Sequence, residues 1–233
     1  MLPGMVNLPG MNASPIRCLV SAGPTREYFD PVRFLSNPSS GKMGYAIAEA
    51  ARQAGWQVDL VSGPVALADP PGVNVTRVET GQEMYDALAP LFATCDVLVM
   101  TAAIMDYRPA EKAPQKVKKD QLDMSVRMEP VMDVLKTLAQ RKRPGQYIVG
   151  FAAETNDLET YARGKLLKKK CDLIVGNYIG RAGTGFQSDQ NTVFLFAPNQ
   201  PARQLGPASK VEIARELVRL IGEGRGTKAD SGE

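Results

Sequence analysis

Short apolar runs alternate with amphipathic stretches along most of the chain. The apolar runs predict strands at residues 17–21, 56–62, 73–78, 96–103, 147–151, 173–177 and 192–196. Apolar residues at helical spacing predict helices at residues 42–54, 82–92, 132–140, 158–169 and 210–221. Apolar strands that alternate with helices are typical of a parallel sheet covered on both faces. The pattern therefore predicts an α/β fold, a Rossmann-like three-layer α/β/α arrangement with a largely parallel sheet.

One region interrupts this pattern. Residues 107–128 are charged, contain Pro109 and Pro114, and alternate polar with apolar positions, which predicts an irregular flap with a short hairpin. The rest predicts a single domain at residues 15–222, because a 44% hydrophobic content supplies a full core. Residues 1–14 are expected to form a flexible leader, and the Gly-rich, charged residues 223–233 a flexible tail.

Composition excludes several classes of protein. The chain has no histidine, which excludes His-dependent triads and the common zinc motifs. Cys18, Cys95 and Cys171 are far apart in apolar contexts, as expected for reduced thiols in a cytoplasmic protein. A net charge of +3 gives no indication of nucleic-acid binding. The longest apolar runs are about half a membrane span, so no membrane association is expected.

The segment R-F-L-S-N-P-S-S-G-K-M-G at residues 33–44 is the most informative in the chain. It lies between the first strand and the first helix, and it brings hydroxyls, an amide and an ammonium group to a helix N-terminus. Such groups bind phosphate and carboxylate oxygens, although an ordinary polar loop is the alternative. It is not a P-loop, since Ser36 replaces the first Gly and Met43 the Ser/Thr, and no dinucleotide fingerprint follows the first strand.

Two groups of lysines are candidates for binding anions. Lys116 and Lys118 project from the same side of an extended segment. Lys165 and Lys169 lie one helical turn apart, a spacing at which like charges repel unless an anion lies between them. The alternative for both groups is a solvated surface.

Polar and aromatic residues also follow the ends of apolar strands. Asp106 could hold Mg²⁺ against a polyphosphate, or it could simply cap the flap. Phe151 could flank a flat ligand, or it could belong to the core. The loops that begin at Gly23, Ala103, Phe151 and Asn177 all leave carboxyl ends of strands, so they are expected to converge on one site.

Four motifs together resemble one family. Besides residues 33–44, the chain contains A-A-I-M-D-Y-R at 102–108, K-V-K-K at 116–119 and G-F-A-A-E-T at 150–155. In this order they are similar to the motifs of bacterial phosphopantothenoylcysteine synthetase, over residues 17–221. The resemblance implies a ligase of coenzyme A biosynthesis that joins phosphopantothenate to L-cysteine, with CTP and Mg²⁺. An acyl-cytidylate forms first, and the products are phosphopantothenoylcysteine, CMP and pyrophosphate.

The resemblance also implies roles for individual residues. Asn37 and Lys116 would be catalytic, Asn37 by handling the acyl-cytidylate and Lys116 by neutralising phosphate charge. Asp106 would serve the nucleotide or its metal ion. Arg33, Asn37, Ala102 and Ala103 would bind phosphopantothenate. The nucleotide would contact Ser39, Ser40, Gly41, Lys42, Asp106, Lys116, Met132, Asp133, Val134, Leu135, Phe151, Lys165 and Lys169.

The family further implies a homodimer whose active site is completed by the partner, with the flap as the exchanged element. Many relatives carry a flavin-dependent decarboxylase before this domain; here a stand-alone form without bound FMN is expected. Two positions depart from the family pattern, Met132 where Pro is common and Tyr178 where Asp is common. They leave open an alternative function, a catalytically inactive nucleotide-binding or regulatory module that retains the pocket.

Overall fold

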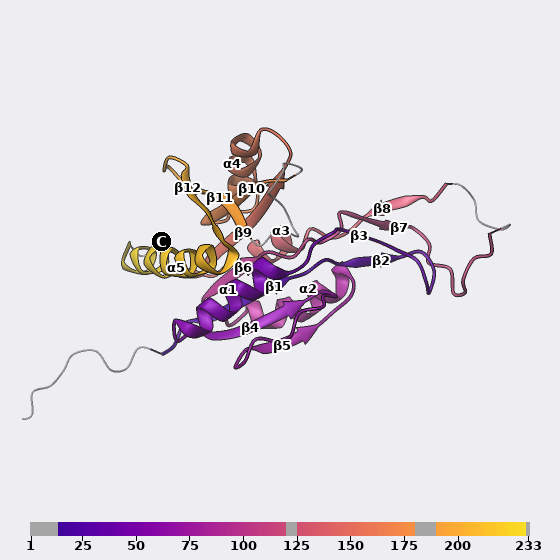
Figure 1. Ribbon diagram of the computed structural model, residues 1–233, viewed down its shortest axis with the longest axis horizontal. Coiled ribbons are helices and arrows are strands. Elements are labelled where there is room, and N and C mark those ends of the chain that lie inside the picture. Colours follow the sequence, from indigo (N-terminus) through magenta and orange to yellow (C-terminus); the bar gives the residue numbers. More distant parts are fainter. Residues whose placement is uncertain (1–13, 120–124, 180–189, 232–233) are drawn as a thin grey trace, which may run out of the picture.

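The chain folds around one large sheet, shown in the ribbon of a computed structural model (Figure 1). The structure describes residues 14–119, 125–179 and 190–231. Eight strands lie in the order β12-β11-β10-β9-β6-β1-β4-β5. Their bounds are β1 Arg17–Ala22, β4 Gln57–Ser62, β5 Asn74–Arg77, β6 Val97–Met100, β9 Tyr147–Glu154, β10 Leu173–Tyr178, β11 Gln190–Phe196 and β12 Arg203–Ser209. The six strands from β10 to β5 are parallel, and β11 and β12 are antiparallel.

Helices cover both faces of the sheet. They are α1 Lys42–Gln53, α2 Gly81–Phe92, α3 Val134–Ala139, α4 Leu158–Lys168 and α5 Lys210–Ser231. The buried residues of α1 and α5 pack with Val20 on one face, and those of α2, α3 and α4 pack with Leu19 on the other. Successive residues of β1 therefore enter different cores, as the pleat of a strand requires. The predicted three-layer α/β/α fold is confirmed.

The last strand of the sheet, β12, was not predicted. It lies at the edge and pairs with β11 alone. Most of its residues are exposed, and it contains Gly206 and Pro207. Because an edge strand buries little, it needs no apolar run, and a Pro inside a segment argues against a strand.

An arm extends from the sheet (Figure 1). One hairpin of the arm pairs β2 (Arg26–Tyr28) with β3 (Phe34–Ser36), and the other pairs β7 (Tyr107–Pro109) with β8 (Met128–Pro130). The sequence predicted a flap with a short hairpin at residues 107–128, and the pairing of β7 with β8 closes the base of that segment; residues 120–124 lie outside the described part. The β2–β3 hairpin was not predicted, because its three-residue strands are too short to show a period.

Asp30 ties the two segments of the arm together. Its buried carboxylate accepts the backbone N–H groups of Val32 and Arg33, both at 2.8 Å, and that of Val117 at 3.3 Å. The Arg33 guanidinium donates to the same carboxylate and to the carbonyl of Val117. These bonds, above all the one from Arg33, hold the pKa of Asp30 well below its usual range.

Helix α5 is longer than predicted. It continues to Ser231, beyond its predicted end at residue 221, and the flexible tail expected at residues 223–233 stays a prediction. Two tertiary contacts support the extra turns. Arg225 forms an ion pair with Asp96 at 3.2 Å, and the backbone at Gly224 lies against the ring of Tyr147. The Gly-rich composition of residues 223–233 suggested a flexible tail, because composition alone does not reveal either of these two contacts. Within the described part of the chain, α5 and the other helices lack the apolar length needed to cross a bilayer.

The N-terminal end of α1 approaches the sheet without an intervening side chain. A Cβ atom at Gly44 would lie 2.4 Å from the Thr101 hydroxyl oxygen and 2.6 Å from the Cβ of Ala22. The helix therefore rests almost directly on the carboxyl ends of β1 and β6. Gly41, the residue before the helix, has a φ of +75°, a conformation that glycine adopts without strain.

We expect Gly44→Ala to lower the free energy of unfolding by about 1–3 kcal/mol, because the new methyl group overpacks this contact. Urea denaturation measures the change. Gly164→Ala is the matched control, since Gly164 lies within α4 with open space around it, and this substitution should stabilise the protein by up to ~1 kcal/mol. If Gly44→Ala and wild type had equal free energies of unfolding, α1 would be able to move away from the sheet without loss of stability.

We expect Asp30→Asn to loosen the arm at neutral pH, because the carboxylate that accepts from both segments is lost. Amide hydrogen exchange in residues 26–36 should accelerate while the central strands stay protected. Asp69→Asn, which removes an exposed ion pair with Arg77, should leave the arm unchanged.

The same contact predicts the pH dependence of the arm. The pKa of Asp30 is lowered by folding, so its contribution is complete above the ordinary aspartate pKa of about 4 and is lost as the pH falls from there toward the lowered value. Arm resonances in NMR spectra should keep their dispersion down to about pH 4 and lose it below. Loss of dispersion already at neutral pH would contradict this assignment.

Candidate active site

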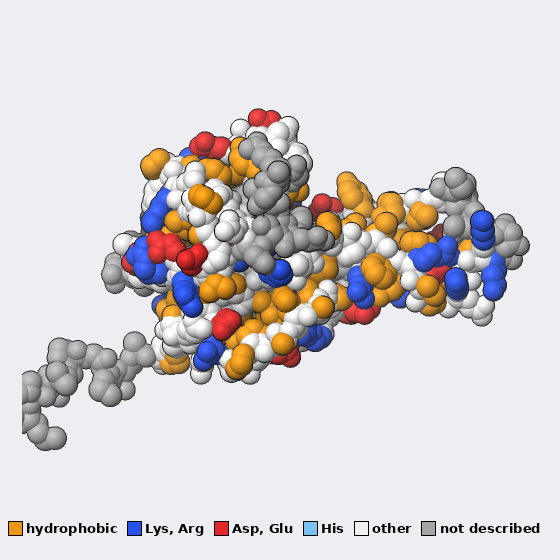
Figure 2. Space-filling view, in the orientation of Figure 1, with side chains coloured by type: hydrophobic (Ala, Val, Ile, Leu, Met, Phe, Trp, Pro, Cys, Tyr) orange, Lys and Arg blue, Asp and Glu red, His pale blue; other side chains and the backbone are white. Residues whose placement is uncertain are grey.

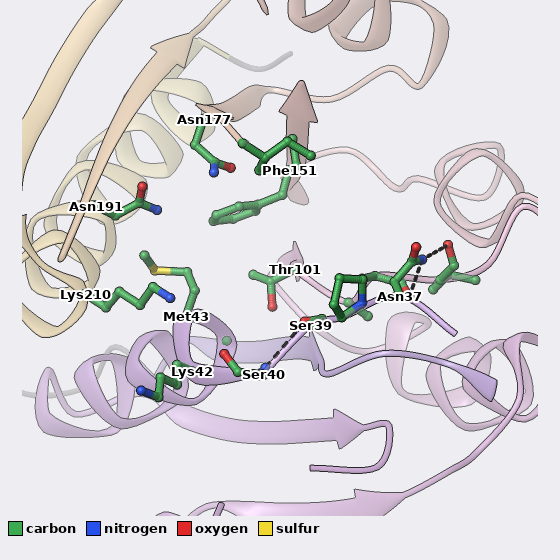
Figure 3. Close-up of a pocket in the computed structure, with 18 of the residues that line it drawn as sticks. Asn37, Ser39, Ser40, Lys42, Met43, Thr101, Phe151, Asn177, Asn191 and Lys210 are labelled. Atoms are coloured by element: carbon green, nitrogen blue, oxygen red, sulfur yellow. Dashed lines mark hydrogen bonds between the residues drawn. The ribbon is translucent and has the colours of Figure 1, made fainter. Parts of the chain in front are cut away.

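A cavity of about 470 Å³ opens at the carboxyl ends of the parallel strands (Figure 3). The segments after β1 and β6 reach this edge, as predicted, whereas Phe151 and Asn177, expected to begin loops, lie within the carboxyl-terminal parts of β9 and β10. The lining residues come from the loop before α1, the first turn of α1, the ends of the parallel strands, β11 and the start of α5: Asn37, Pro38, Ser39, Ser40, Gly41, Lys42, Met43, Gly44, Thr101, Ala102, Ala103, Ile104, Asp106, Phe151, Ala153, Lys165, Asn177, Ile179, Asn191 and Lys210.

The first turn of α1 forms one wall of the cavity. Gly41 precedes the helix and supplies no side chain to cap the first backbone N–H groups. The hydroxyl of Ser39 accepts the N–H of Gly41 at 3.4 Å and so shapes the loop. A helix N-terminus with this opening carries partial positive charge and attracts anions. The predicted residues Ser39, Ser40, Gly41 and Lys42 are all brought to the cavity.

Asn37 fixes the loop before α1 to the end of β6. Its side-chain amide donates to the carbonyls of Ala103 at 3.2 Å and Ile104 at 3.4 Å. The role implied by the family requires donation to a ligand instead. The amide therefore has to exchange these two partners, or to extend beyond them, when a ligand binds.

Lys165 lies beside Phe151 at the cavity wall. Its ammonium donates to the carbonyl of Phe151. Burial lowers the pKa of Lys165, and the nearby thiol of Cys171 and carboxylates of Glu154 and Asp106 oppose that shift. The Phe151 ring faces the cavity (Figure 3), which favours contact with a ligand over a role confined to the core.

Several predicted nucleotide residues do not line this cavity. Asp133 accepts the N–H of Lys136 at 3.0 Å and thereby caps α3. Lys169 forms an ion pair with Asp133 and does not line the cavity. Val134 and Leu135 are buried in the core, and Met132 precedes them outside the cavity.

Arg33 and Lys116 are also absent from the cavity wall, because both lie on the arm. Arg33 is held by Asp30, and the Lys116 side chain is exposed. The cavity of one chain therefore contains only part of the predicted site.

Four polar residues of the cavity were missed. Thr101 donates its hydroxyl hydrogen to the carbonyl of Ser21 at 2.5 Å. Asn177 lies near the carboxyl end of β10. Asn191 and Lys210 come from β11 and α5. Lys210 was expected to begin a helix, and the Ser-x-x-Glu signature at residues 209–212 agrees with that start, but only the topology brings it to the sheet edge.

The cavity favours anionic ligands. Among its described lining residues, Lys42, Lys165 and Lys210 are cationic and Asp106 is the one carboxylate. No cluster of three metal-ligating carboxylates or thiols occurs in residues 14–119, 125–179 and 190–231. Asp106 alone would fit Mg²⁺, because this ion is commonly held by one or two carboxylates together with substrate phosphates.

The sequence and the fold both match known proteins. Residues 14–224 match the model of the DNA/pantothenate metabolism flavoprotein C-terminal domain. The coenzyme A biosynthesis bifunctional protein CoaBC of Vibrio vulnificus strain YJ016 is 46% identical over 205 residues, which is 87% of this chain and 51% of that protein. CoaBC of Bacillus subtilis is 42% identical over 204 residues, 87% of this chain and 50% of that protein. The chain thus spans about half the length of the curated relatives it matches.

Solved structures agree. The crystal structure of the C-terminal domain of CoaBC is 41% identical, with a TM-score of 0.75 over 88% of this chain and 93% of that one. A DNA/pantothenate metabolism flavoprotein from Streptococcus pneumoniae is 21% identical, with a TM-score of 0.77 over 89% and 99%, and supports the fold alone. The resemblance predicted from four sequence motifs is therefore confirmed: this chain belongs to the family of the DNA/pantothenate metabolism flavoprotein C-terminal domain.

Proposed function

We propose that this protein is a cytoplasmic phosphopantothenate–cysteine ligase of coenzyme A biosynthesis, which uses CTP and Mg²⁺ and forms an acyl-cytidylate. The observation that carries the proposal is the cationic cavity at the N-terminus of α1, in which Asn37, Asp106 and Phe151 come together. The 41% identity to the C-terminal domain of CoaBC over nearly the whole of that domain supports it.

The first step requires no general base. The attacking carboxylate of phosphopantothenate is ionised at neutral pH, which is consistent with a chain that contains no histidine. The obstacle is the approach of an anionic carboxylate to a triphosphate. The helix N-terminus, Lys42 and Lys165 supply positive potential that offsets this repulsion.

The residues of the cavity divide this work. The backbone of Ser39 to Gly41 would hold phosphate oxygens, and Asn37 would contact the reacting carbonyl. Phe151 would flank the cytosine ring. Asp106 would hold Mg²⁺, which supplies charge neutralisation on the phosphates. In the second step the amine of cysteine attacks the acyl carbon, the amide bond forms, and CMP leaves with the bonding electron pair.

We propose further that two chains form a homodimer in which the arm of one chain completes the cavity of the other. Arg33 and Lys116 lie on the arm, away from the cavity of their own chain. Figure 2 shows apolar side chains along the arm and Lys and Arg side chains toward its far end. Large apolar side chains exposed on the arm are those of Val32, Phe34, Leu35, Tyr107 and Val126. Such a patch is typical of a protein–protein interface.

A coupled assay tests the activity directly. Pyrophosphate release should require phosphopantothenate together with CTP and Mg²⁺, and formation of phosphopantothenoylcysteine should require cysteine as well. Comparing CTP with ATP, GTP and UTP tests the choice of base. Binding of CTP without turnover would instead favour an inactive nucleotide-binding or regulatory module.

We expect Asn37→Asp to lower the ligase rate by roughly a hundredfold. A carboxylate cannot donate to the carbonyls of Ala103 and Ile104, and it repels the phosphate and the acyl oxygen. Single-turnover assays should show acyl-cytidylate that persists without conversion to product. Undiminished turnover would remove the assigned role of Asn37.

We expect Lys116→Gln to lower the rate by roughly a hundredfold, whereas Lys119→Gln, a neighbouring exposed lysine, should change it less than twofold. If the arm acts on the partner, Asn37→Asp and Lys116→Gln chains should complement each other. Unfolding and refolding them together in equal amounts should restore about a quarter of the wild-type rate, because half of the dimers are mixed and each has one intact site. Failure to regain activity would contradict arm exchange.

A further inference from the structure

A buried lysine lies at the end of the cavity away from Asn37. Lys210 is the first residue of α5 and is 7% exposed, yet it lines the cavity. In Figure 3 its side chain points toward Met43 and ends beside it, and Asn37 lies at the opposite side of the view. Burying an ammonium group is unfavourable unless charged or polar groups compensate. Its position places a positive charge at this end of a cavity suited to anions.

The start of α5 holds this lysine in place. Ser209 and Glu212 form a capping box: the Ser209 N–H donates to the Glu212 carboxylate at 2.9 Å, and the Glu212 N–H donates to the Ser209 hydroxyl at 3.2 Å. Lys210 lies between them, in the first turn of the helix, where the helix dipole disfavours a cation. The positive charge of Lys210 therefore lies close to the partial positive charges at the N-termini of α1 and α5.

Asn191 supplies neutral donors next to Lys210. It is 8% exposed, lines the cavity from β11, and lies beside a bulge in the pairing of β11 with β12. Its side-chain oxygen accepts the N–H of Thr192 at 2.9 Å. The amide therefore presents its N–H hydrogens on the other side. A β-bulge changes the direction in which a side chain points, and bulges are common next to active sites.

The carboxylate of the cavity lies at the other end. Asn37 donates to the carbonyls of Ala103 and Ile104. Asp106 is two positions after Ile104 in the chain and therefore lies near Asn37. Lys42, in contrast, lies on α1 near Lys210, and both also line a second cavity between α1 and α5. The end formed by Lys210, Asn191 and Lys42 thus carries donors and positive charge. Among the described residues that line the first cavity, Asp106 is the one carboxylate, whereas Glu49 and Asp69 line the second cavity.

We propose that Lys210 and Asn191 bind the β- and γ-phosphates of the nucleotide, and then the pyrophosphate product; this inference rests on the proposed function. The carboxylate oxygen attacks the α-phosphorus from the Asn37 end. As that P–O bond forms, the bond from the α-phosphorus to the bridging oxygen of the β-phosphate breaks, and the electron pair leaves with pyrophosphate. In-line displacement places the leaving group opposite the nucleophile, which is the end that contains Lys210. Lys210 stabilises the charge that develops there.

Isothermal titration calorimetry with Mg²⁺ present compares CTP, CMP and pyrophosphate. We expect Lys210→Gln to weaken CTP and pyrophosphate binding by roughly tenfold to a hundredfold and CMP binding by less than twofold. Asn191→Leu should shift the same two ligands by a smaller factor. Lys168→Gln, an exposed lysine at the end of α4, is the control and should change none of them. Lys210→Arg, which keeps the charge, should retain most of the preference for CTP over CMP.

Thermal unfolding separates binding from folding. The melting temperature of Lys210→Gln, compared with that of wild type, shows whether the variant is folded at the temperature of the titrations. Equal loss of CTP and CMP affinity, or an unchanged preference for CTP, would overturn the phosphate subsite while wild-type turnover left the ligase intact. If wild type bound CTP but formed no product, the proposed function would fail, and the same titrations would still decide the subsite.

Discussion

The site depends on the contact between the backbone of α1 and the ends of β1 and β6. Gly44 meets Ala22 and Thr101 there with no side chain between them. This contact lowers the first turn of α1 to the level of the strand ends. Peptide groups of the helix and side chains of the strand loops can then face the same ligand. A larger residue would raise the helix and separate the two sets of donors.

Sequence periodicity predicted the elements that bury apolar surface. All seven predicted strands and four of the five predicted helices are present within a few residues of their expected limits, and the fifth helix, α5, continues beyond its predicted end at residue 221 to Ser231. The elements it missed are the edge strand β12 and the short hairpins of the arm. These are stabilised by pairing and by Asp30, and such contacts leave no periodic signal in a sequence.

The candidate site was predictable where its residues adjoin strand ends. Asp106 and Phe151 follow this rule, Asn37 was expected from the family motif, and the structure brings the three together. Lys210 and Asn191 were missed because their segments reach the cavity through the antiparallel extension of the sheet. The motif match also implied nucleotide contacts at residues 132–135, which lie outside this cavity and stay a prediction; in this structure Asp133 caps α3 and pairs with Lys169. Sequence spacing alone does not separate a ligand contact from a cap.

Asp30 has a consequence for the order in which the molecule assembles. It joins segments whose contacting residues are 87 positions apart, and the strands β4, β5 and β6 lie between them in the chain. Closing so long a loop before those strands are in place would be entropically unfavourable. The arm is therefore among the last parts to become ordered as the chain folds. A nascent chain that stops before Val117 would carry the β2–β3 segment without its anchor, and its apolar side chains would be open to chaperones or to aggregation.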